Sequence, residues 1–533
     1  MFYTPLGFTS GDAYRSHDWQ IAATHDALFR DAVLEHGQFP LRSHLVGGGY
    51  PVIAHPSDSS LSPMILPSLV LGERLGLKVN LVLAMLLGAM GVFLLARDVI
   101  GLGGLGPLLA ALGFVVAGWH PSRVLVGYYE STFYLFFPMM LYLLLTAGRS
   151  AVRLVLAAAL TATCFLQVLG GAVAFLLYAG VHLLYGFRGE VFTQTRLRSW
   201  KLAVAVMALA AGLGAVKFVP MLHLLGRGTN DRMDPHLLAQ MPAGAADGFL
   251  YTRSYYFYSE YRSLAASGHL DFFYDSPASL AHSLVNAVPL KNEYVQLPAG
   301  DQTPKHPDYP YLNVGWAVLG LGLLGLVLVP VARPMRRHAL VLVLFSLVCF
   351  GVHAPVDLFR PLSYLPVVNS MRRPIQYFNF FIYAELVLLA GFALWWLQQR
   401  LRDRRLQAVL AAVAALALVP TAVENAARYR QAFRLELPAV TPATEFYQVK
   451  LRNAYLREQM ARGYGDTYLN VLRRVGSVLW DSNIKLPENA RPRYMVNDDG
   501  VLSLAGGYRG EAHFEDSRNR VTRVSITPNV ITA

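Results

Sequence analysis

The sequence predicts an all-α polytopic membrane bundle of about ten visible transmembrane helices, followed by a small α+β extracytoplasmic segment. Of its 533 residues, 54% are hydrophobic and only 15% are charged, whereas soluble domains have about 25% charged residues. The apolar residues gather in long runs rather than at regular helical or strand spacings. Both cysteines, Cys164 and Cys349, lie inside such runs and suggest neither a disulfide nor a zinc site. Together these features exclude a cytosolic enzyme, a secreted disulfide scaffold and a disordered chain.

The apolar runs approach the length that a helix needs to cross a bilayer, about 20 residues. Several runs are short, which favours helices packed in a bundle over isolated anchors. The apolar stretch over 152–187 is too long for one crossing, so we divide it at Gly170 and Gly171. The predicted spans are 79–97, 103–119, 131–147, 152–168, 171–187, 201–223, 311–332, 338–353, 375–397 and 406–421.

By itself, the net charge of +12 suggests a protein that binds nucleic acid. Most of the basic residues, however, lie in short loops between the apolar runs, which argues against that interpretation. Alternate loops contain an excess of arginine, which the positive-inside rule assigns to the cytoplasm. These loops contain Arg97, Arg149, Arg153, Arg188, Arg196, Arg198, Lys201, Arg333, Arg336, Arg337, Arg400, Arg402, Arg404 and Arg405. The chain is therefore predicted to be a multi-pass protein of a bacterial cytoplasmic (inner) membrane, with its long segments and C-terminus outside and no nucleic-acid partner.

The predicted organisation has three parts. Residues 1–78 form a first extracytoplasmic segment, 79–421 a transmembrane bundle that includes an outer loop over 224–310, and 422–533 an extracytoplasmic α+β tail. Residues 1–78 contain no signal sequence or span to carry them outside, so we expect a helix upstream. Residues 524–527 alternate like a strand with no partner following, so we also expect the tail to be truncated.

The outside segments contain the polar residues. A helix from about Asp18 to His36, stopped by Gly37, has an apolar face and is predicted to lie on the membrane surface. The second outer loop, 119–130, is short and polar. The third is aromatic, with Tyr251, Tyr255, Tyr256, Phe257, Tyr258, Tyr261, Phe272, Phe273 and Tyr274. In the tail we expect a helix over 444–462 and strands near 494–496, 501–504 and 521–526.

Several short motifs occur in a familiar order. A helix with an early Asp18 is followed by Phe39-Pro40-Leu41, Gly48-Gly49-Tyr50-Pro51, His55-Pro56-Ser57, Leu61-Ser62-Pro63 and Leu95-Ala96-Arg97. Further along come Tyr311-Leu312-Asn313-Val314-Gly315, Arg372-Arg373-Pro374 and Gly507-Tyr508-Arg509-Gly510-Glu511. The order resembles the YfhO-type bacterial membrane proteins of the GT-C glycosyltransferase superfamily. The resemblance implies a GT-C-like bundle, a lipid-linked sugar donor and catalysis on the outer face by an Asp of the first outer segment. The chain departs from the family pattern at both ends, since in the family a transmembrane helix precedes that Asp and the tail continues further.

The chemistry of such a transferase can be read from the residues as well. Activated nucleotide sugars are made in the cytosol, so an outer-face enzyme needs a donor such as a polyprenyl-phosphate sugar. A carboxylate must then take the proton of the acceptor hydroxyl, and Asp18 is the predicted base. An Asp in the first turn of a helix also interacts favourably with the helix dipole whatever the function. Glu130 is a second candidate acid, to position the acceptor or hold a divalent cation, and a solvated loop acid is the simpler interpretation.

Cations are required where the phosphate departs, and arginine suits that role. Arg372 and Arg373 are candidates, although a pair of interfacial lipid anchors would look the same. His17 and Asp12 are candidates to flank the base, and Arg42 and His55 to line the cleft, although an ordinary loop hydrogen bond is the favoured interpretation for each. Lys217, late in an apolar run, is either functional or extends to the outer surface. No metal ligand and no cofactor is assigned with certainty; a divalent cation stays an open alternative.

The predicted function is therefore transfer of a sugar from a polyprenyl-phosphate donor to an extracytoplasmic glycan, lipid or protein of the cell envelope. The protein is expected to act while embedded in membrane lipid. The first alternative is a transporter or flippase of lipid-linked sugars. Transporters often contain buried charges in broken helices, whereas here buried charges are expected to be nearly absent. The second alternative is a non-catalytic membrane assembly factor for cell-envelope glycans, whose outer loops bind a partner enzyme. The sugar, the acceptor and the oligomeric state are not encoded in any recognisable motif.

Overall fold

The computed structural model describes the helices, most of the first segment and parts of the tail. The described residues are 17–46, 51–55, 58–125, 128–167, 169–186, 194–226, 258–259, 262, 273–287, 311–365, 367–371, 374–432, 440–450, 467–477, 493–496, 502–504, 506 and 525–532. The chain divides into two compact units. Unit 1 comprises residues 81–214 and 255–432 together with Met1, and unit 2 comprises 2–80, 215–254 and 433–533.

Helices are the only regular secondary structure among the described residues of unit 1, and the unit boundaries fall within two of the helices, α3 and α9. The helices are α3 (Glu73–Leu94), α4 (Gly106–Val116), α5 (Trp119–Leu125), α6 (Phe137–Thr146), α7 (Ala151–Gln167), α8 (Leu169–Gly186), α9 (Gln194–Gly226), α13 (Pro277–Val285), α15 (Gly315–Val327), α16 (Arg336–Phe350), α17 (Phe359–Leu362), α18 (Pro374–Arg400), α19 (Arg404–Leu416) and α20 (Val419–Ala432). A π-helical turn, Leu95–Ile100, extends α3, and short 3-10 helices join others at Tyr129–Phe136, Ala147–Arg149, Val329–Val331, Arg333–Met335, Gly351–His353 and Val368–Ser370.

Each of the ten predicted apolar segments is largely helical. Within the described part of the chain, seven helices are long and apolar enough to cross a membrane: Glu73–Ile100, Gly106–Leu125, Tyr129–Arg149, Val204–Met221, Arg336–His353, Pro374–Arg400 and Arg404–Arg430. The other three segments correspond to shorter apolar helices, Ala151–Gln167, Gly171–Tyr185 and Gly315–Val327. Many leucine and valine side chains on these helices are exposed, as expected of surfaces that face lipid rather than water.

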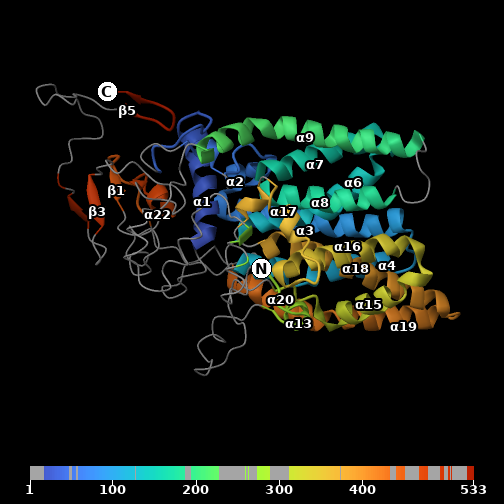
Figure 1. Ribbon diagram of the computed structural model, residues 1–533. Helices are drawn as coiled ribbons and strands as arrows, with labels where there is room; N and C mark the ends of the chain where they lie inside the picture. Colours follow the sequence, from blue (N-terminus) through green and yellow to red (C-terminus); the bar gives the residue numbers. More distant parts are fainter. Residues whose placement is uncertain are drawn as a thin grey trace, which may run out of the picture. The chain divides into compact units, whose positions relative to one another are not determined.

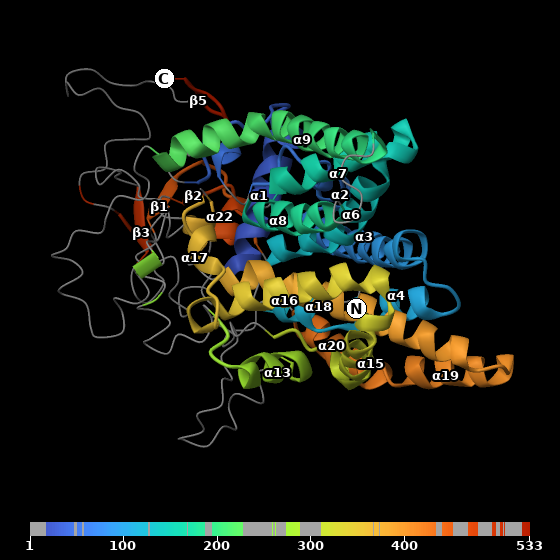
Figure 2. The ribbon, with the colours of Figure 1, turned by 45° about the vertical axis from the view of Figure 1, so that its right-hand side comes forward.

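Helix α18 is the centre of unit 1. It packs against α4, α8, α15 and α16, and in both views it runs beside α16 (Figure 1 and Figure 2). Its residues from Phe378 to Leu394 are all buried. Glycines allow this close packing: a Cβ at Gly325 of α15 would lie 2.3 Å from the carbonyl oxygen of Leu389, and one at Gly391 of α18 would lie 2.6 Å from that of Gly106. Small residues at such contacts let helix backbones approach one another.

Three boundaries in unit 1 differ from the prediction. Helix α7 ends at Gln167 and α8 begins at Leu169, before the glycine pair 170–171. Residues 119–125 form helix α5, with Trp119, His120 and Arg123 buried, rather than a solvated loop. The last predicted span is followed by α20, which ends at Ala432, so eleven residues of the predicted tail are helical. In the last two cases helical packing extends beyond the apolar run, because tertiary contacts bury polar residues such as Arg123 and Asn425 that hydropathy assigns to loops.

Unit 2 is organised around α1 (His17–Arg30), which continues as a π-helical turn, Asp31–Glu35. The helix ends as predicted, with Gly37 at φ +60°, a backbone conformation that suits glycine. All residues from Ala23 to Phe29 are buried, so the prediction of a surface helix is wrong. A helix lying on a membrane would leave one polar face exposed, whereas the two turns of α1 from Ala23 to Phe29 are buried on every side. Short helices follow at Val52–Ala54, Pro63–Ile65 and α2 (Leu66–Leu71).

The described residues of the tail beyond α20 form small sheets and one helix. Strands β1 (Gln448–Lys450), β2 (Gly476–Ser477), β3 (Tyr494–Val496) and β4 (Leu502–Leu504) form a four-stranded sheet in the order β2-β1-β3-β4, with α22 (Thr467–Leu472) packed against β2. Strand β1 is parallel to β2 and β3, and β3 is antiparallel to β4. The first segment joins this sheet through a bridge between Val46 and Ser477.

Two predictions for the tail are wrong. Residues 444–450 are not helical, because Gln448–Lys450 is the strand β1; the rest of the predicted helix lies outside the described residues. Strand β5 (Ser525–Ile526) does have a partner, since β6 (Ile531–Thr532) pairs with it antiparallel. The strands near 494–496 and 502–504 are confirmed. The alternation Tyr447-Gln448-Val449 was the signal for β1, with Val449 fully buried and Gln448 paired along the sheet.

Candidate functional site

The predicted base, Asp18, lies in the first turn of α1, next to His17, the first residue of the helix. The structure describes the backbone of His17 and Asp18, and Asp18 precedes His25 by seven residues. Seven residues make about two helical turns, so Asp18 and His25 share a face of α1 about 10 Å apart along its axis. Asp12, Arg372 and Arg373 lie outside the described residues.

Two turns of α1 after Asp18, the helix contributes to a cluster of buried polar residues. The first residue of this cluster is Asp26. One carboxylate oxygen of Asp26 accepts a hydrogen bond from the hydroxyl of Ser59 at 2.7 Å, and the other accepts one from Ser68 at 2.5 Å. The carboxyl group is 2% exposed. Burial raises the pKa of Asp26 to about 7, although both serine hydrogen bonds act in the opposite direction. Asp26 therefore exchanges its proton near neutral pH, which is where general acids and bases operate best.

The second member of the cluster is Asp58, which is fully buried. Its carboxylate accepts hydrogen bonds from the hydroxyl (2.7 Å) and the backbone N–H (3.2 Å) of Ser60. Burial raises the pKa of Asp58, and the positive charge of Lys217 is the largest opposing influence. The ammonium group of Lys217 also donates a hydrogen bond to the backbone carbonyl of Asp58. A buried acid with an opposite charge beside it is the arrangement in which both groups can stay ionised.

Two histidines complete the cluster. Nδ1 of His25 lies 3.7 Å from a carboxylate oxygen of Asp58, and the rings of His25 and His55 are 4.6 Å apart. Burial lowers the pKa of His25 well below its usual value, and the neighbouring His55 and Lys217 lower it further. At neutral pH the imidazole of His25 is therefore uncharged. His55, predicted to line the cleft, is 4% exposed and does join the cluster.

Lys217 is the predicted residue whose position the structure decides most clearly. Its side chain is 1% exposed, so the alternative in which it extends to the outer surface is wrong. The lysine lies on α9, 159 residues from Asp58 in sequence. Placing an ammonium group in a buried environment is costly without a partner, and Asp58 is that partner. The sequence signal, one lysine within an apolar run, indicated an interaction but could not identify Asp58.

An ion pair ties α1 to other parts of the same unit. The guanidinium group of Arg30 lies 2.7 Å from a carboxylate oxygen of Glu73, at the start of α3. The hydroxyl of Tyr468, in α22, donates to the other oxygen of Glu73 at 2.7 Å. The second half of the helix that contains Asp18 is thus held by contacts of His25, Asp26 and Arg30. A catalytic residue needs a rigid support of this kind to hold its geometry.

Two predicted site residues are not part of the cluster. The side chain of Arg42 is exposed, and its backbone N–H donates to Asn529 at 3.1 Å. Glu130 is exposed in the 3-10 helix Tyr129–Phe136 of unit 1. In the aromatic third loop, Phe273 and Tyr274 are buried core residues, Tyr258 donates a hydrogen bond to Asp357, and the other predicted aromatic residues lie outside the described part.

A second polar cluster lies among the apolar helices of unit 1, around Glu385 of α18. Its carboxylate accepts from the hydroxyl of Tyr178 at 2.7 Å and contacts Nε2 of His182 at 3.0 Å and Nδ1 of His338 at 2.7 Å. Nε of Arg337 lies 3.1 Å from Nε2 of His338. Glu385 is completely buried. The expectation that buried charges are nearly absent from the bundle is therefore wrong.

Sequence reasoning missed Asp26, Asp58 and Glu385. The signal for Glu385 was present, because an acid in the middle of an apolar run is expensive and marks a functional or structural partner. The same holds for His182 and His338, each close to the end of a run. Asp26 and Asp58 had no such signal, since both belong to polar stretches in which most acids are solvated.

Comparisons with known proteins identify no family for this chain. No protein-family model matches the sequence, and a search of curated proteins finds no significant match. The functional interpretation therefore depends on the residues and their geometry.

Proposed function

We propose that this chain is an integral membrane glycosyltransferase with a GT-C-like bundle, acting at the outer face of a bacterial inner membrane. It would transfer a sugar from a polyprenyl-phosphate donor to a glycan, lipid or protein of the cell envelope. The observation that carries the proposal is the buried acid cluster of Asp26, Asp58 and Lys217, which supports the helix bearing Asp18. The ten apolar helices would cross the membrane with the arginine-rich loops inside.

In the proposed reaction the Asp18 carboxylate takes the proton of the acceptor hydroxyl. The hydroxyl oxygen forms a bond to the anomeric carbon of the donor sugar, while the bond from that carbon to the phosphate oxygen breaks. Polyprenyl phosphate leaves with the electron pair, and the configuration at the anomeric carbon inverts. Arg372 and Arg373 are the proposed cations for the departing phosphate, because guanidinium groups match phosphate oxygens.

Asp26 can be compared with Asp18 as the residue that acts as the base. Its pKa of about 7 is suited to proton transfer, but both of its oxygens are already engaged by serines and its carboxyl is buried. We therefore assign Asp26 a positioning role and Asp18 the contact with substrate. A positioning acid should affect stability and the apparent KM more than it affects the chemical step.

The test is transfer of a radiolabelled sugar in membranes that contain the full-length protein, with several polyprenyl-phosphate donors. Asp18→Asn keeps the shape of the side chain and removes the base, and we expect it to lower the rate about 100-fold or more. Asp275→Asn, an exposed acid of the third outer loop, is the matched control and should leave the rate unchanged. Undiminished transfer in Asp18→Asn at equal expression would contradict the assignment of the base. Absence of transfer by the unsubstituted protein with every donor would contradict the transferase proposal itself.

One observation favours a second function, proton-coupled transport of lipid-linked sugars. Glu385 with His182 and His338 forms a chain of buried ionisable groups inside the bundle, and such chains occur as proton relays in transporters. Proteoliposomes containing a fluorescent lipid-linked sugar and an internal pH dye separate the two functions. A transporter should move sugar and protons together and lose both in Glu385→Gln, with sugar transfer absent. A transferase should show no coupled flux, and Glu385→Gln should then act only on stability.

A further inference from the structure

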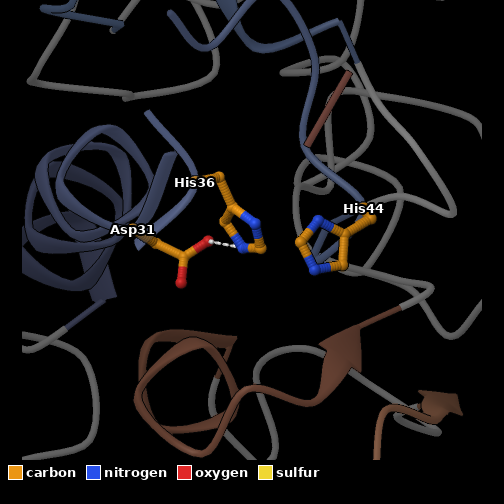
Figure 3. A group of neighbouring side chains, drawn as sticks. All are labelled: Asp31, His36 and His44. Atoms are coloured by element: carbon orange, nitrogen blue, oxygen red, sulfur yellow. Dashed lines mark ion pairs between the residues drawn. The ribbon is translucent and has the colours of Figure 1, made fainter. Parts of the chain in front are cut away.

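Three side chains at the end of α1 are arranged like the ligands of a metal ion. Asp31 lies in the π-helical turn, His36 just before the glycine that ends the helix, and His44 after the chain has reversed. Figure 3 shows their carboxylate and imidazole groups facing one another across a shared space. One ligand atom from each lies within 4.8 Å of the other two, and Nε2 of His36 lies 3.7 Å from a carboxylate oxygen of Asp31.

We propose that Asp31, His36 and His44 bind a divalent transition metal ion, with Zn²⁺ as the expected occupant. Two imidazoles and one carboxylate are a ligand set that zinc accepts, with bond lengths near 2.0–2.2 Å. Tetrahedral ligands at that distance lie about 3.3 Å apart, so small side-chain rotations bring the three atoms into position. Three protein ligands leave one coordination position for water or for an oxygen of an anionic ligand.

The atoms of Asp31, His36 and His44 that would bind the metal do not form hydrogen bonds to one another. The separation of 3.7 Å between His36 and Asp31 is too long for a hydrogen bond. Nδ1 of His44 is a buried atom with no hydrogen-bond partner among the described residues, which is costly unless something occupies it.

The surroundings hold the three ligands in place. The ring of His44 packs against Phe446 at 5.1 Å, next to strand β1, and edge-on to His36 at 5.9 Å. The neighbouring acid, Glu35, is paired with Arg474 at 3.0 Å, which leaves Asp31 as the carboxylate of the site. A metal ion bound here would link His44, which follows the chain reversal at Gly37, to Asp31 and His36 at the end of the helix.

The histidine pair around Glu385 is a poorer metal site, and the comparison shows what a metal site requires. Arg337 donates to Nε2 of His338, so Nδ1 of His338 carries the proton that it donates to Glu385. The carboxylate also accepts from Tyr178 and His182. A metal ion would have to displace these bonds beside a guanidinium charge.

The experiment uses the full chain in detergent, purified through an affinity tag that contains no histidine. Metal content after incubation with Zn²⁺ and removal of the excess is measured by mass spectrometry, and bound Co²⁺ by its visible absorption. We expect about one equivalent per chain and at least about tenfold weaker binding in Asp31→Asn, His36→Asn and His44→Asn, since even outer-shell substitutions weaken metal binding by about 10–100-fold. The exposed His353→Asn and the buried His182→Asn are the controls and should retain binding.

Two results would overturn the proposal. One is an unsubstituted protein that binds no more Zn²⁺ than the Asp31→Asn variant; the other is retention of full binding by His36→Asn. His36 is only partly buried, so its variant should elute and melt like the metal-free parent, and it decides the question even where His44→Asn fails to fold. Loss of the metal in His182→Asn alone would assign the ion to the Glu385 cluster and also contradict the proposal. The outcome is independent of whether the chain transfers sugar.

Discussion

At the scale of single residues, the structure contains carboxyl groups that are buried away from water. Asp26 keeps hydrogen bonds to Ser59 and Ser68, yet burial outweighs them and raises its pKa to about 7. The folded state therefore holds the proton of Asp26 more tightly than the unfolded chain does. As the pH rises from about 4 to about 7, the unfolded chain releases this proton first, so unfolding becomes progressively easier.

Asp26→Asn should remove this pH dependence. At about 1.4 kcal/mol for each pH unit, ionised Asp26 costs the fold up to about 4 kcal/mol above pH 7 and nothing below pH 4. The variant should therefore gain stability relative to the parent as the pH is raised from 5 to 8, measured as the apparent Tm in detergent. Asp275→Asn, which replaces an exposed acid, is the control and should follow the parent at both pH values. Parallel curves for Asp26→Asn and the parent would contradict the assigned pKa shift.

At the scale of secondary-structure elements, unit 1 depends on how closely helices approach α18. Gly325 and Gly320 lie on the same helix, α15, but in different environments. A Cβ at Gly325 would lie 2.3 Å from the carbonyl oxygen of Leu389, whereas one at Gly320 would meet nothing within 4 Å. Backbone cannot move aside as the tip of a flexible side chain can, so a methyl group at Gly325 must push α15 and α18 apart.

Gly325→Ala should lower the stability of the bundle by about 1–3 kcal/mol, the usual cost of inserting a methyl group into a packed contact. Gly320→Ala should be neutral or slightly stabilising, because alanine favours a helix by about 1 kcal/mol over glycine. Thermal unfolding of both variants in the same detergent checks the prediction. Equal Tm values for the two variants would mean that α15 and α18 are not packed through Gly325.

At the scale of the whole molecule, the functional proposal requires that the outer segments and the arginine-rich loops lie on opposite sides of a membrane. Asp275 belongs to the predicted outer loop 224–310, and Arg402 to a predicted cytoplasmic loop. Three predicted spans, 311–332, 338–353 and 375–397, separate them in the sequence. An odd number of crossings places two residues on opposite faces.

Labelling with a membrane-impermeant maleimide tests this topology. Asp275→Cys should react in cells with a permeabilised outer envelope, and Arg402→Cys should react only after the inner membrane is opened. Both positions are exposed, and the two native cysteines are buried and free, so the parent protein is the unlabelled control. Reaction of both variants before the membrane is opened would contradict an odd number of crossings between them, and the reverse pattern would invert the proposed orientation.

Much of the architecture could be predicted from the sequence, and particular residues show why. The ten apolar segments are helices, Gly37 ends α1, Pro374 begins α18 and the strands near Tyr494 and Leu502 form as expected. These features depend on local chemistry: backbone groups in apolar runs must satisfy one another within a helix, and glycine and proline restrict the backbone where they stand. For the same reason the break between α7 and α8 was placed within a few residues.

The candidate site depended on contacts between distant residues, and only the tertiary structure decided it. Lys217 meets Asp58 across 159 residues, and Glu385 meets His182 across 203. Local hydropathy marks such residues as unusual, but it does not say which partner compensates each charge, because that depends on how the helices pack. Burial of α1, which periodicity assigned to a membrane surface, has the same origin. Pairing of buried polar groups is a property of the packed chain, whereas the helices that carry them follow from composition along it.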